Sequence, residues 1–321
     1  MSLASAFTTA VMPIIAVAVV GYIFASVYDI DIEPVNTVGL YIMIPALAFH
    51  SIATTPMGGG EIMKLSLGVV AYALVMVVIA GAVGKAIGTS ETLLGALMLA
   101  SAFPNSGFIG IPLSEFAFGE VGGTTAVLYL TVQNVVVYTL GVYIASSGTE
   151  RNSRDAVLEI FRLPLIYAVV AAVALRGLGL MPPDGGATIA AVMDTIKIVG
   201  DASIPLMLLI VGMKLAETDV QALSKTVTPT VLKLGVAPVV AFGLAILLGF
   251  DDLTVARTFI IESATPAATI PLALLIEYQG DVETEEITPA EYLSTVIFVT
   301  TILSVVVLTV LVYLLRAGMV M

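Results

Sequence analysis

The chain has 321 residues, of which 59% are hydrophobic and only 11% are charged, and its formal net charge is −12. Soluble domains contain about 25% charged residues, so this composition, with a mean hydropathy of +1.09, excludes an ordinary soluble protein and indicates a membrane protein. The absence of cysteine excludes disulfides and thiolate metal sites, and a single histidine excludes a site with several histidine ligands, so we expect neither a metal nor a cofactor.

Charged residues and clusters of glycine and proline divide the chain into ten apolar stretches, each close to the length that crosses a bilayer. No basic region precedes the first stretch, so we expect it to remain as a span rather than to be removed as a signal peptide. The predicted spans are 5–27, 35–54, 63–87, 91–117, 122–146, 160–180, 195–215, 226–249, 255–279 and 287–316. The sequence therefore predicts an all-α polytopic membrane protein with ten transmembrane helices.

Orientation follows from lysine and arginine in short loops, which are commoner on the cytoplasmic side. With the amino terminus outside, the cytoplasmic loops hold six such residues and the extracellular loops hold four. We therefore predict a multi-pass protein of the cell membrane with both termini extracellular. We interpret the acidic loops as an adaptation to high salt, which says little about the substrate.

The fourth and ninth predicted spans are interrupted by proline. Pro104 and Pro112 lie inside the fourth span, and Pro266 and Pro271 lie inside the ninth. Proline removes a backbone donor and forces the preceding residue out of the helical region, so both helices should break. Unwound backbone at membrane depth must be buried in protein or line a wet cavity, and each break offers a half-helix amino terminus that suits an anion. The alternative is a pair of kinked packing helices, because proline is common in membrane helices.

Features of the first half recur in the same order about 160 residues later. With five spans in each half, the second half enters the membrane from the opposite side, which predicts an inverted repeat. We expect residues 1–147 to form the first repeat, 148–159 a central polar loop, and 160–321 the second repeat. The recurring pairs are Pro45 with Pro205, Lys64 with Lys233, Pro104 with Pro266, Pro112 with Pro271, and Tyr129 with Tyr292.

Four segments carry a resemblance to a known family: PNSGFIGIP at 104–112, LTVQNVVVYTL at 130–140, ASIPLMLLIVGMKLA at 202–216, and TPAATIPLALLIEY followed by LSTVIF within 265–298. Through them the chain resembles the auxin efflux carrier family, which includes PIN-type auxin exporters and microbial carriers of small carboxylates. The ASIP segment is typical of the microbial branch, and the acidity fits a haloarchaeon. The resemblance implies two inverted five-helix repeats with crossing fourth and ninth helices. It also implies a scaffold domain of spans 1, 2, 6 and 7, a transport domain of spans 3–5 and 8–10, and a homodimer.

The same resemblance implies that Asn105 binds substrate and that Pro112 and Pro271 are crossover prolines. Where PIN-type proteins have Pro-Gln-Gly, this chain has Pro266-Ala267-Ala268, which disfavours auxin itself as the substrate. Amides in membrane helices can also serve only to bond neighbouring helices, so that alternative stays open for two of the candidates. The candidate substrate-binding residues are Asn105, Ser106, Gln133, Asn134, Thr265 and Ala267.

Ionisable residues inside spans are candidates for ion coupling. They are His50, Glu115 and Glu262. A lone histidine is more often a packing residue, and the two carboxylates could lie near enough to an interface to be solvated. The repeat-related lysines Lys64 and Lys233 come early in their spans and are expected to extend toward the headgroups.

These features favour a secondary transporter that moves a small organic anion, such as a carboxylate, an auxin-like acid or a dicarboxylate, by alternating access. The alternative is a sodium- or proton-coupled symporter or antiporter of the bile-acid-symporter-like fold. Such exchangers usually hold carboxylates at the crossing, where this chain has Asn105, Ser106 and Thr265. No hydrolase or metalloprotease motif is present, so we predict that the protein is not an enzyme. The expected partners are the anion and the lipid bilayer, without nucleic acid.

Overall fold

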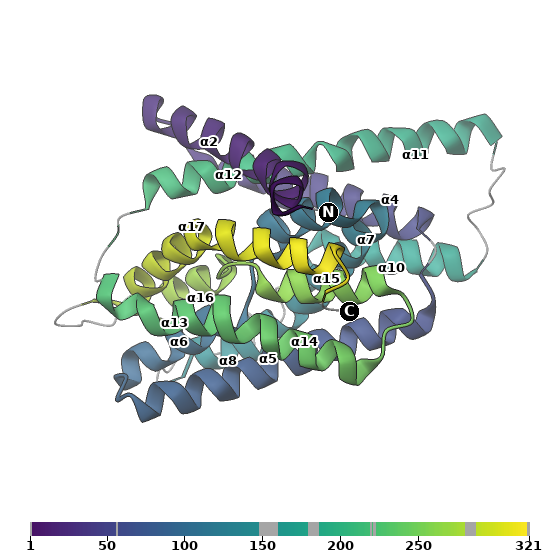
Figure 1. The fold of residues 1–321 in the computed structure, drawn as a ribbon. Coiled ribbons are helices and arrows are strands. Elements are labelled where there is room, and N and C mark those ends of the chain that lie inside the picture. The colour runs from purple at the N-terminus through teal and green to yellow at the C-terminus, as the bar shows by residue number, and fades with distance from the viewer. Residues whose placement is uncertain are drawn as a thin grey trace.

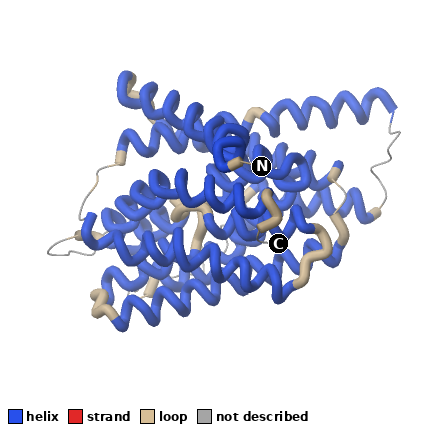
Figure 2. The backbone as a smooth tube through the Cα atoms, viewed as in Figure 1, coloured by secondary structure: helices blue, strands red, loops and turns tan. Residues whose placement is uncertain are grey.

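The computed structural model describes residues 2–55, 57–147, 160–178, 186–218, 220, 223–279 and 287–319. Within these ranges the regular structure is helical, apart from one isolated bridge between Pro104 and Ala267. Most of the long helices run side by side along one direction, as Figures 1 and 2 show. The predicted central loop, with Arg151 and Arg154 on which the orientation partly depends, lies outside the described residues.

Seven helical segments in the described part of the chain are long and apolar enough to cross a membrane. They are Leu3–Val27, Ile32–Thr54, Gly59–Ala86, Ser106–Ala145, Ile189–Glu217, Leu223–Leu248 and Pro289–Arg316. Three shorter apolar helices, Glu91–Ala102, Pro164–Gly177 and Ile270–Gln279, lie in the predicted fourth, sixth and ninth spans. The all-α polytopic class is therefore confirmed, whereas the number of ten spans stays a prediction.

The first half of the chain corresponds to the predicted spans 1 to 5. Its helices are α1 Leu3–Ala6, η1 Phe7–Val11, α2 Met12–Val27, α3 Ile32–Val38, η2 Gly39–Met43, α4 Ile44–Thr54, α5 Gly59–Ala86, α6 Glu91–Ala102, η3 Ser106–Gly110, α7 Ile111–Val136, η4 Val137–Gly141 and α8 Val142–Ala145. The segments η1, η2, η3 and η4 are π-helical turns.

The second half repeats the pattern of a long helix, a broken helix and a final long helix. Its helices are η5 Ile160–Arg162, α10 Pro164–Gly177, α11 Gly186–Asp201, α12 Ser203–Glu217, η6 Leu223–Thr226, α13 Val227–Val231, η7 Leu232–Val236, α14 Ala237–Leu248, α15 Leu253–Ala264, α16 Ile270–Gln279 and α17 Pro289–Arg316. The last helix begins with a capping box in which Thr288 and Glu291 satisfy each other's backbone N–H groups.

The predicted boundary between spans 4 and 5 is a sharp bend rather than a loop. Helical hydrogen bonding continues through α7, but Gly119 has φ 67° and ψ −159°, a conformation that is essentially restricted to glycine. This single residue separates the second half of the fourth span from the fifth span. The sequence signal was present in the glycines of FGEVGG at 118–123, but it did not specify a bend this short.

Spans 1, 2, 6 and 7 pack against one another. Helix α12 lies along α2, and both α10 and α11 contact α4, as can be followed in Figure 1. Arg176, at the end of α10, donates hydrogen bonds to the carbonyl oxygens of Thr55 and Met57 just beyond α4. These contacts hold together the helices that the resemblance assigns to a scaffold domain, although the division into two domains stays a prediction.

The expectation that the repeat-related lysines extend toward the headgroups is wrong for Lys233. Lys64 donates hydrogen bonds to the Gly249 carbonyl at 2.7 Å and to Asp251 at 2.9 Å, so it closes the carboxyl end of α14. Lys233 is fully buried and donates to the Tyr72 hydroxyl at 3.0 Å and the Ser263 carbonyl at 3.1 Å. The position of a residue in the repeat predicts how far along its helix it lies, but not on which face of the helix. Lys233 lies on the face that packs against the rest of the protein.

Candidate functional site

The two broken helices meet at their breaks. Helix α6 ends at Ala102 and α15 ends at Ala264, and the short extended segments that follow run antiparallel to each other. The N–H of Asn105 donates to the Pro266 carbonyl at 2.7 Å, and the N–H of Ala268 donates to the Phe103 carbonyl at 3.0 Å. The backbone groups freed by the breaks are therefore paired inside the protein, as membrane depth requires. The predicted breaks in these two helices are therefore observed, and the bridge joins them, whereas the substrate-binding crossover stays a prediction.

The four candidate prolines divide into two kinds. Pro104 and Pro266 lie in the extended segments at the crossing itself. Pro271 is in the first turn of α16, directly after its break, where proline is well tolerated because the first N–H groups of a helix have no partner. Pro112 is in the first turn of α7, but the π-helical turn η3 precedes it. Helical structure thus runs through Pro112, and of the two prolines in the predicted break of the fourth span it is Pro104 that lies at the break.

A cavity of about 360 Å³ lies beside the crossing. It is bounded by the amino-terminal turns that follow both breaks and by α3, α7 and α12. Its main polar and charged lining residues are Glu33, Asn36, Thr37, Asn105, Ser106, Gln133, Asn134, Lys214 and Thr269. The sequence therefore predicted four of these residues as members of a binding site, and the structure brings those four together in one space.

Asn105 and Asn134 are the two lining amides with hydrogen-bonding capacity to spare. The Asn105 side chain accepts a bond from the Phe108 N–H at 3.3 Å and so caps η3, while its amide nitrogen makes no bond with another described residue. The Asn134 oxygen is buried without a hydrogen-bond partner among the described residues. Both residues are only 6% exposed. A ligand that accepts hydrogen bonds could use the amide nitrogens of both residues, whereas the Asn134 oxygen could be satisfied only by a donor.

Gln133 has a different environment from its neighbour Asn134. Its amide nitrogen donates to the Pro104 carbonyl at 2.8 Å, and its oxygen accepts from the Ser106 hydroxyl at 3.0 Å. It therefore connects the fifth span to the crossing and holds the break in place. Gln133 and Ser106 border the cavity, but their groups are already engaged with each other.

Thr265 and Ala267 lie in the break of the ninth span, where Ala267 forms the bridge with Pro104. Both are fully buried. The Thr265 hydroxyl donates to the Glu262 carbonyl at 2.8 Å, and the Ala267 N–H donates to the Thr300 hydroxyl at 3.2 Å. Neither residue lines the cavity, so the structure places these two candidates in the packing of the ninth span rather than at the predicted site.

Lys214 was missed as a site residue. From the sequence it counted only as a loop charge, yet it projects from α12 into the cavity with its ammonium 5.0 Å from the centroid of the Phe108 ring. A basic residue inside the predicted span 195–215 was the signal that could have identified it, because an intramembrane charge is functional by default.

The three candidates for ion coupling lie in two places. Glu262 is fully buried behind the crossing, where one of its oxygens accepts from the Ser114 hydroxyl at 2.6 Å and the other has no partner among the described residues. A β-carbon on Gly110 would lie 2.0 Å from that second oxygen, so a larger residue there would require the Glu262 carboxyl group to move. His50 and Glu115 instead line a separate cavity of about 140 Å³ together with the ion pair of Lys197 and Asp201, whose charged atoms are 2.8 Å apart.

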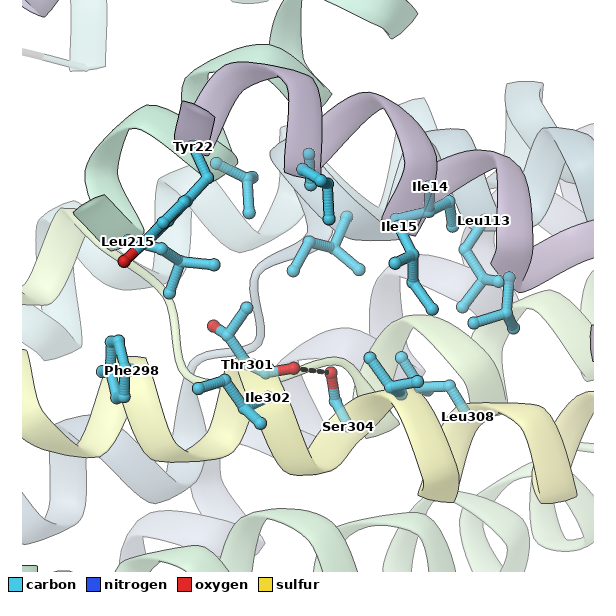
Figure 3. Close-up of a pocket in the computed structure, with 16 residues that line it drawn as sticks. Ile14, Ile15, Tyr22, Leu113, Leu215, Phe298, Thr301, Ile302, Ser304 and Leu308 are labelled. Carbon is cyan, nitrogen blue, oxygen red and sulfur yellow. Dashed lines mark hydrogen bonds between the residues drawn. The ribbon is translucent and has the colours of Figure 1, made fainter. Parts of the chain in front are cut away.

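A third cavity, of about 400 Å³, is almost entirely apolar. Figure 3 shows Ile14, Ile15 and Tyr22 of α2 facing Phe298, Ile302 and Leu308 of α17 across it, and its one drawn hydrogen bond joins Ser304 to Thr301 within α17. No charged residue lines this space, so an anion there would lose its hydration without compensation. Among the described residues no cluster of histidine and acidic side chains could hold a metal ion.

Comparison with known proteins identifies the relatives of this chain. The model of the family described as "Membrane transport protein" matches residues 6–312. An uncharacterized transporter of Methanothermobacter thermautotrophicus is 25% identical over 93% of this chain and 95% of its own length. A protein of Rhizobium meliloti that carries the provisional name of malonate transporter is 27% identical over 97% of this chain and 96% of its own length.

Proposed function

Because the chain belongs to the membrane transport protein family, which is the auxin efflux carrier family expected from its motifs, we propose that it is a secondary transporter of a small organic anion. The substrate is a carboxylate that binds in the cavity beside the crossing of the fourth and ninth spans. It crosses the cell membrane by alternating access, without ATP.

The cavity at the crossing is the observation that carries this proposal. Two half-helix amino termini, those of η3 with α7 and of α16, border it, and their positive dipole ends favour an anion. The amide nitrogens of Asn105 and Asn134, which donate to no described residue, add two donors for a carboxylate. A carboxylate would find there the donors that it needs to leave water.

Alternating access is supported by a second cavity at the other end of the same helices. Residues Glu33 to Ile44 of the second span line the cavity of about 360 Å³, and residues Leu47 to Thr55 line the cavity of about 140 Å³. The buried side chains of Ile44 and Leu47 lie between them. We propose that the cavity of about 360 Å³ is the open end of one transport pathway and that the cavity of about 140 Å³ is its closed end. In the orientation predicted from loop charges, the open end faces the cytoplasm.

The moving part would be spans 3–5 and 8–10, which carry the crossing, against a scaffold of spans 1, 2, 6 and 7. The resemblance implies that this scaffold also forms a homodimer. The name of the Rhizobium meliloti relative suggests a small dicarboxylate, and the replacement of Pro-Gln-Gly by Pro266-Ala267-Ala268 argues against auxin.

Proton coupling is a second proposal, and Glu262 supports it. A fully buried carboxylate with one unpartnered oxygen is costly when charged, so its protonation could follow the state of the crossing. The sodium-coupled alternative would require oxygen ligands around a cation, and the groups nearest the crossing are largely paired with each other.

Counterflow in proteoliposomes tests the transport function. Vesicles loaded with unlabelled malonate should accumulate labelled malonate through the wild type, and Asn105→Ala should lose most of this uptake. Thr139→Ala, which changes an exposed residue on the fifth span, serves as the control. Stimulation by a pH gradient would support proton coupling, whereas a requirement for Na⁺ would support the sodium-coupled alternative. Wild-type uptake by Asn105→Ala would refute the site.

A further inference from the structure

Lys214 lies where three cavities meet. It lines the cavity beside the crossing, a wider one of about 610 Å³ that continues along α12 and α16, and a small one of about 30 Å³ between them. Thr269, at the ninth break, lines the same three spaces. The ammonium of Lys214 is thus positioned on the route between the crossing and the wider space.

The charge of Lys214 has no counter-ion within ion-pair distance among the described residues. Lys214 is the one basic residue that lines the cavity at the crossing, and Glu33 on α3 is its one acidic lining residue. Glu217, one turn further along α12, lines the wider cavity with Glu291, which is engaged with Thr288 in the capping box. The Phe108 ring offers the ammonium a cation–π contact at 5.0 Å, which only partly replaces the water that a half-buried charge loses.

Lys214 and Asn105 border the same small cavity. The Phe108 ring lies under the ammonium, and the N–H of the same residue is held by the Asn105 side chain. Both Lys214 and Asn105 line the cavity of about 30 Å³. One side of the site therefore offers neutral amide and backbone donors, and the other offers a cation.

We propose that Lys214 is a second anion-binding point, and that the site takes a short dicarboxylate carrying two charges rather than a monocarboxylate. One carboxylate binds at the crossing, against the amides of Asn105 and Asn134 and the half-helix amino termini. The other pairs with the ammonium of Lys214. This inference rests on the proposed function, because it assigns the substrate class of the same cavity.

A monocarboxylate can satisfy only one of the two ends. If it bound at the crossing, the ammonium of Lys214 would still lack a counter-ion, and if it bound the ammonium, the amides would remain without partners. Hydrogen bonds between charged groups are roughly twice as strong as neutral ones. The second carboxylate should therefore contribute strongly to affinity.

Matched pairs of acids test the proposal. Binding of malonate and propionate, and of succinate and butyrate, is measured by titration calorimetry on the purified full-length protein. The wild type should bind each dicarboxylate at least about tenfold more tightly than its matched monocarboxylate. Lys214→Met keeps the length of the side chain without the charge. It should weaken dicarboxylate binding by about tenfold or more and change monocarboxylate binding by less than about threefold.

Two controls separate charge at the site from charge in general and from misfolding. Lys85→Met removes an exposed lysine at the end of α5 and should bind all four acids like the wild type. Lys214→Met and Lys214→Gln should unfold at the same temperature as the wild type or higher, because each removes a half-buried charge without an ion pair among the described residues. A large fall in melting temperature in both variants would assign Lys214 a structural role and overturn the proposal.

The outcomes also separate this inference from the proposed function. If Lys214→Met binds malonate like the wild type, or loses malonate and propionate equally, the dicarboxylate assignment is wrong. If Asn105→Ala at the same time loses both acids, the site at the crossing stands without it. If Asn105→Ala keeps both acids, the proposed site itself fails.

Discussion

The neighbouring amides Gln133 and Asn134 allow a direct separation of structural and ligand-binding roles. Gln133→Met removes two hydrogen bonds. The buried Ser106 hydroxyl loses its acceptor, whereas the Pro104 carbonyl keeps the hydrogen bond from the Ser106 N–H at 2.9 Å. A lost bond costs about 0.5–1.5 kcal/mol, and a buried group left unsatisfied costs about 1–3 kcal/mol. We expect Gln133→Met to lose about 1–3 kcal/mol of stability, since the cost of the lost bonds and that of the one unsatisfied hydroxyl overlap.

Asn134→Leu likewise replaces an amide by an apolar side chain of similar size, but we expect no loss of stability. The oxygen of Asn134 already lacks a partner, and replacing an unsatisfied buried polar group by an apolar one of similar shape is neutral or stabilising. The melting temperature of Asn134→Leu should therefore equal or exceed that of the wild type. Its affinity for malonate should fall by about tenfold or more, because a donor to the carboxylate is lost.

The assay is thermal unfolding followed by circular dichroism in one detergent and at one scan rate, because membrane proteins of this size often unfold irreversibly. Malonate titration on the same samples gives the affinity. If Asn134→Leu proved less stable than Gln133→Met, or if Gln133→Met unfolded like the wild type, the division of roles between the two amides would be refuted.

Three further predictions concern the surroundings of the site. Gly110→Ala places a β-carbon 2.0 Å from the unpartnered Glu262 oxygen, so it should lower stability by about 1–3 kcal/mol. Adding Glu262→Ala to the same chain should recover part of that loss, as measured by thermal unfolding. Glu262→Gln should fold normally but lose stimulation of malonate uptake by a pH gradient, whereas retained stimulation would exclude this residue from coupling. The hydrogen bond from Lys64, followed by that with Glu61, lowers the pKa of Asp251. A lowered folded-state pKa gives stability that is present above the ordinary value of about 3.9 and is lost as the pH falls through the lower folded-state value. Lys64→Met should therefore flatten the dependence of melting temperature on pH below about pH 4. The same dependence in the variant as in the wild type would contradict this.

The parts of the fold that depend on local chemistry could be predicted from the sequence. Proline fixes the backbone of its own residue and of the residue before it, so Pro104 and Pro266 located both breaks without any structure. The repeat placed the two breaks opposite each other. Pro112 carried the same local signal, but proline is also compatible with the first turn of a helix, and that is its role here.

Contacts between distant residues and the faces of helices were harder to predict. Side chains alternate between the two sides of the extended segment at 265–268, and nothing local specifies its register against 103–105. Thr265 and Ala267 were therefore predicted to bind substrate, although neither lines the cavity. Lys214 was counted among the loop charges because it lies one residue before the end of the predicted span 195–215, whereas α12 continues to Glu217 and the side chain enters the cavity. The meeting of His50 with Glu115 depends on tertiary packing between α4 and α7.

The location of a bound dicarboxylate tests the central claim most directly. In crystals soaked with bromomalonate, an anomalous difference map locates the bromine without reference to any assumed pose. We predict one peak in the cavity bordered by Asn105, Asn134 and Lys214. A peak in the apolar cavity between α2 and α17, or beside His50 and Glu115, with none at the crossing, would contradict the proposed binding site.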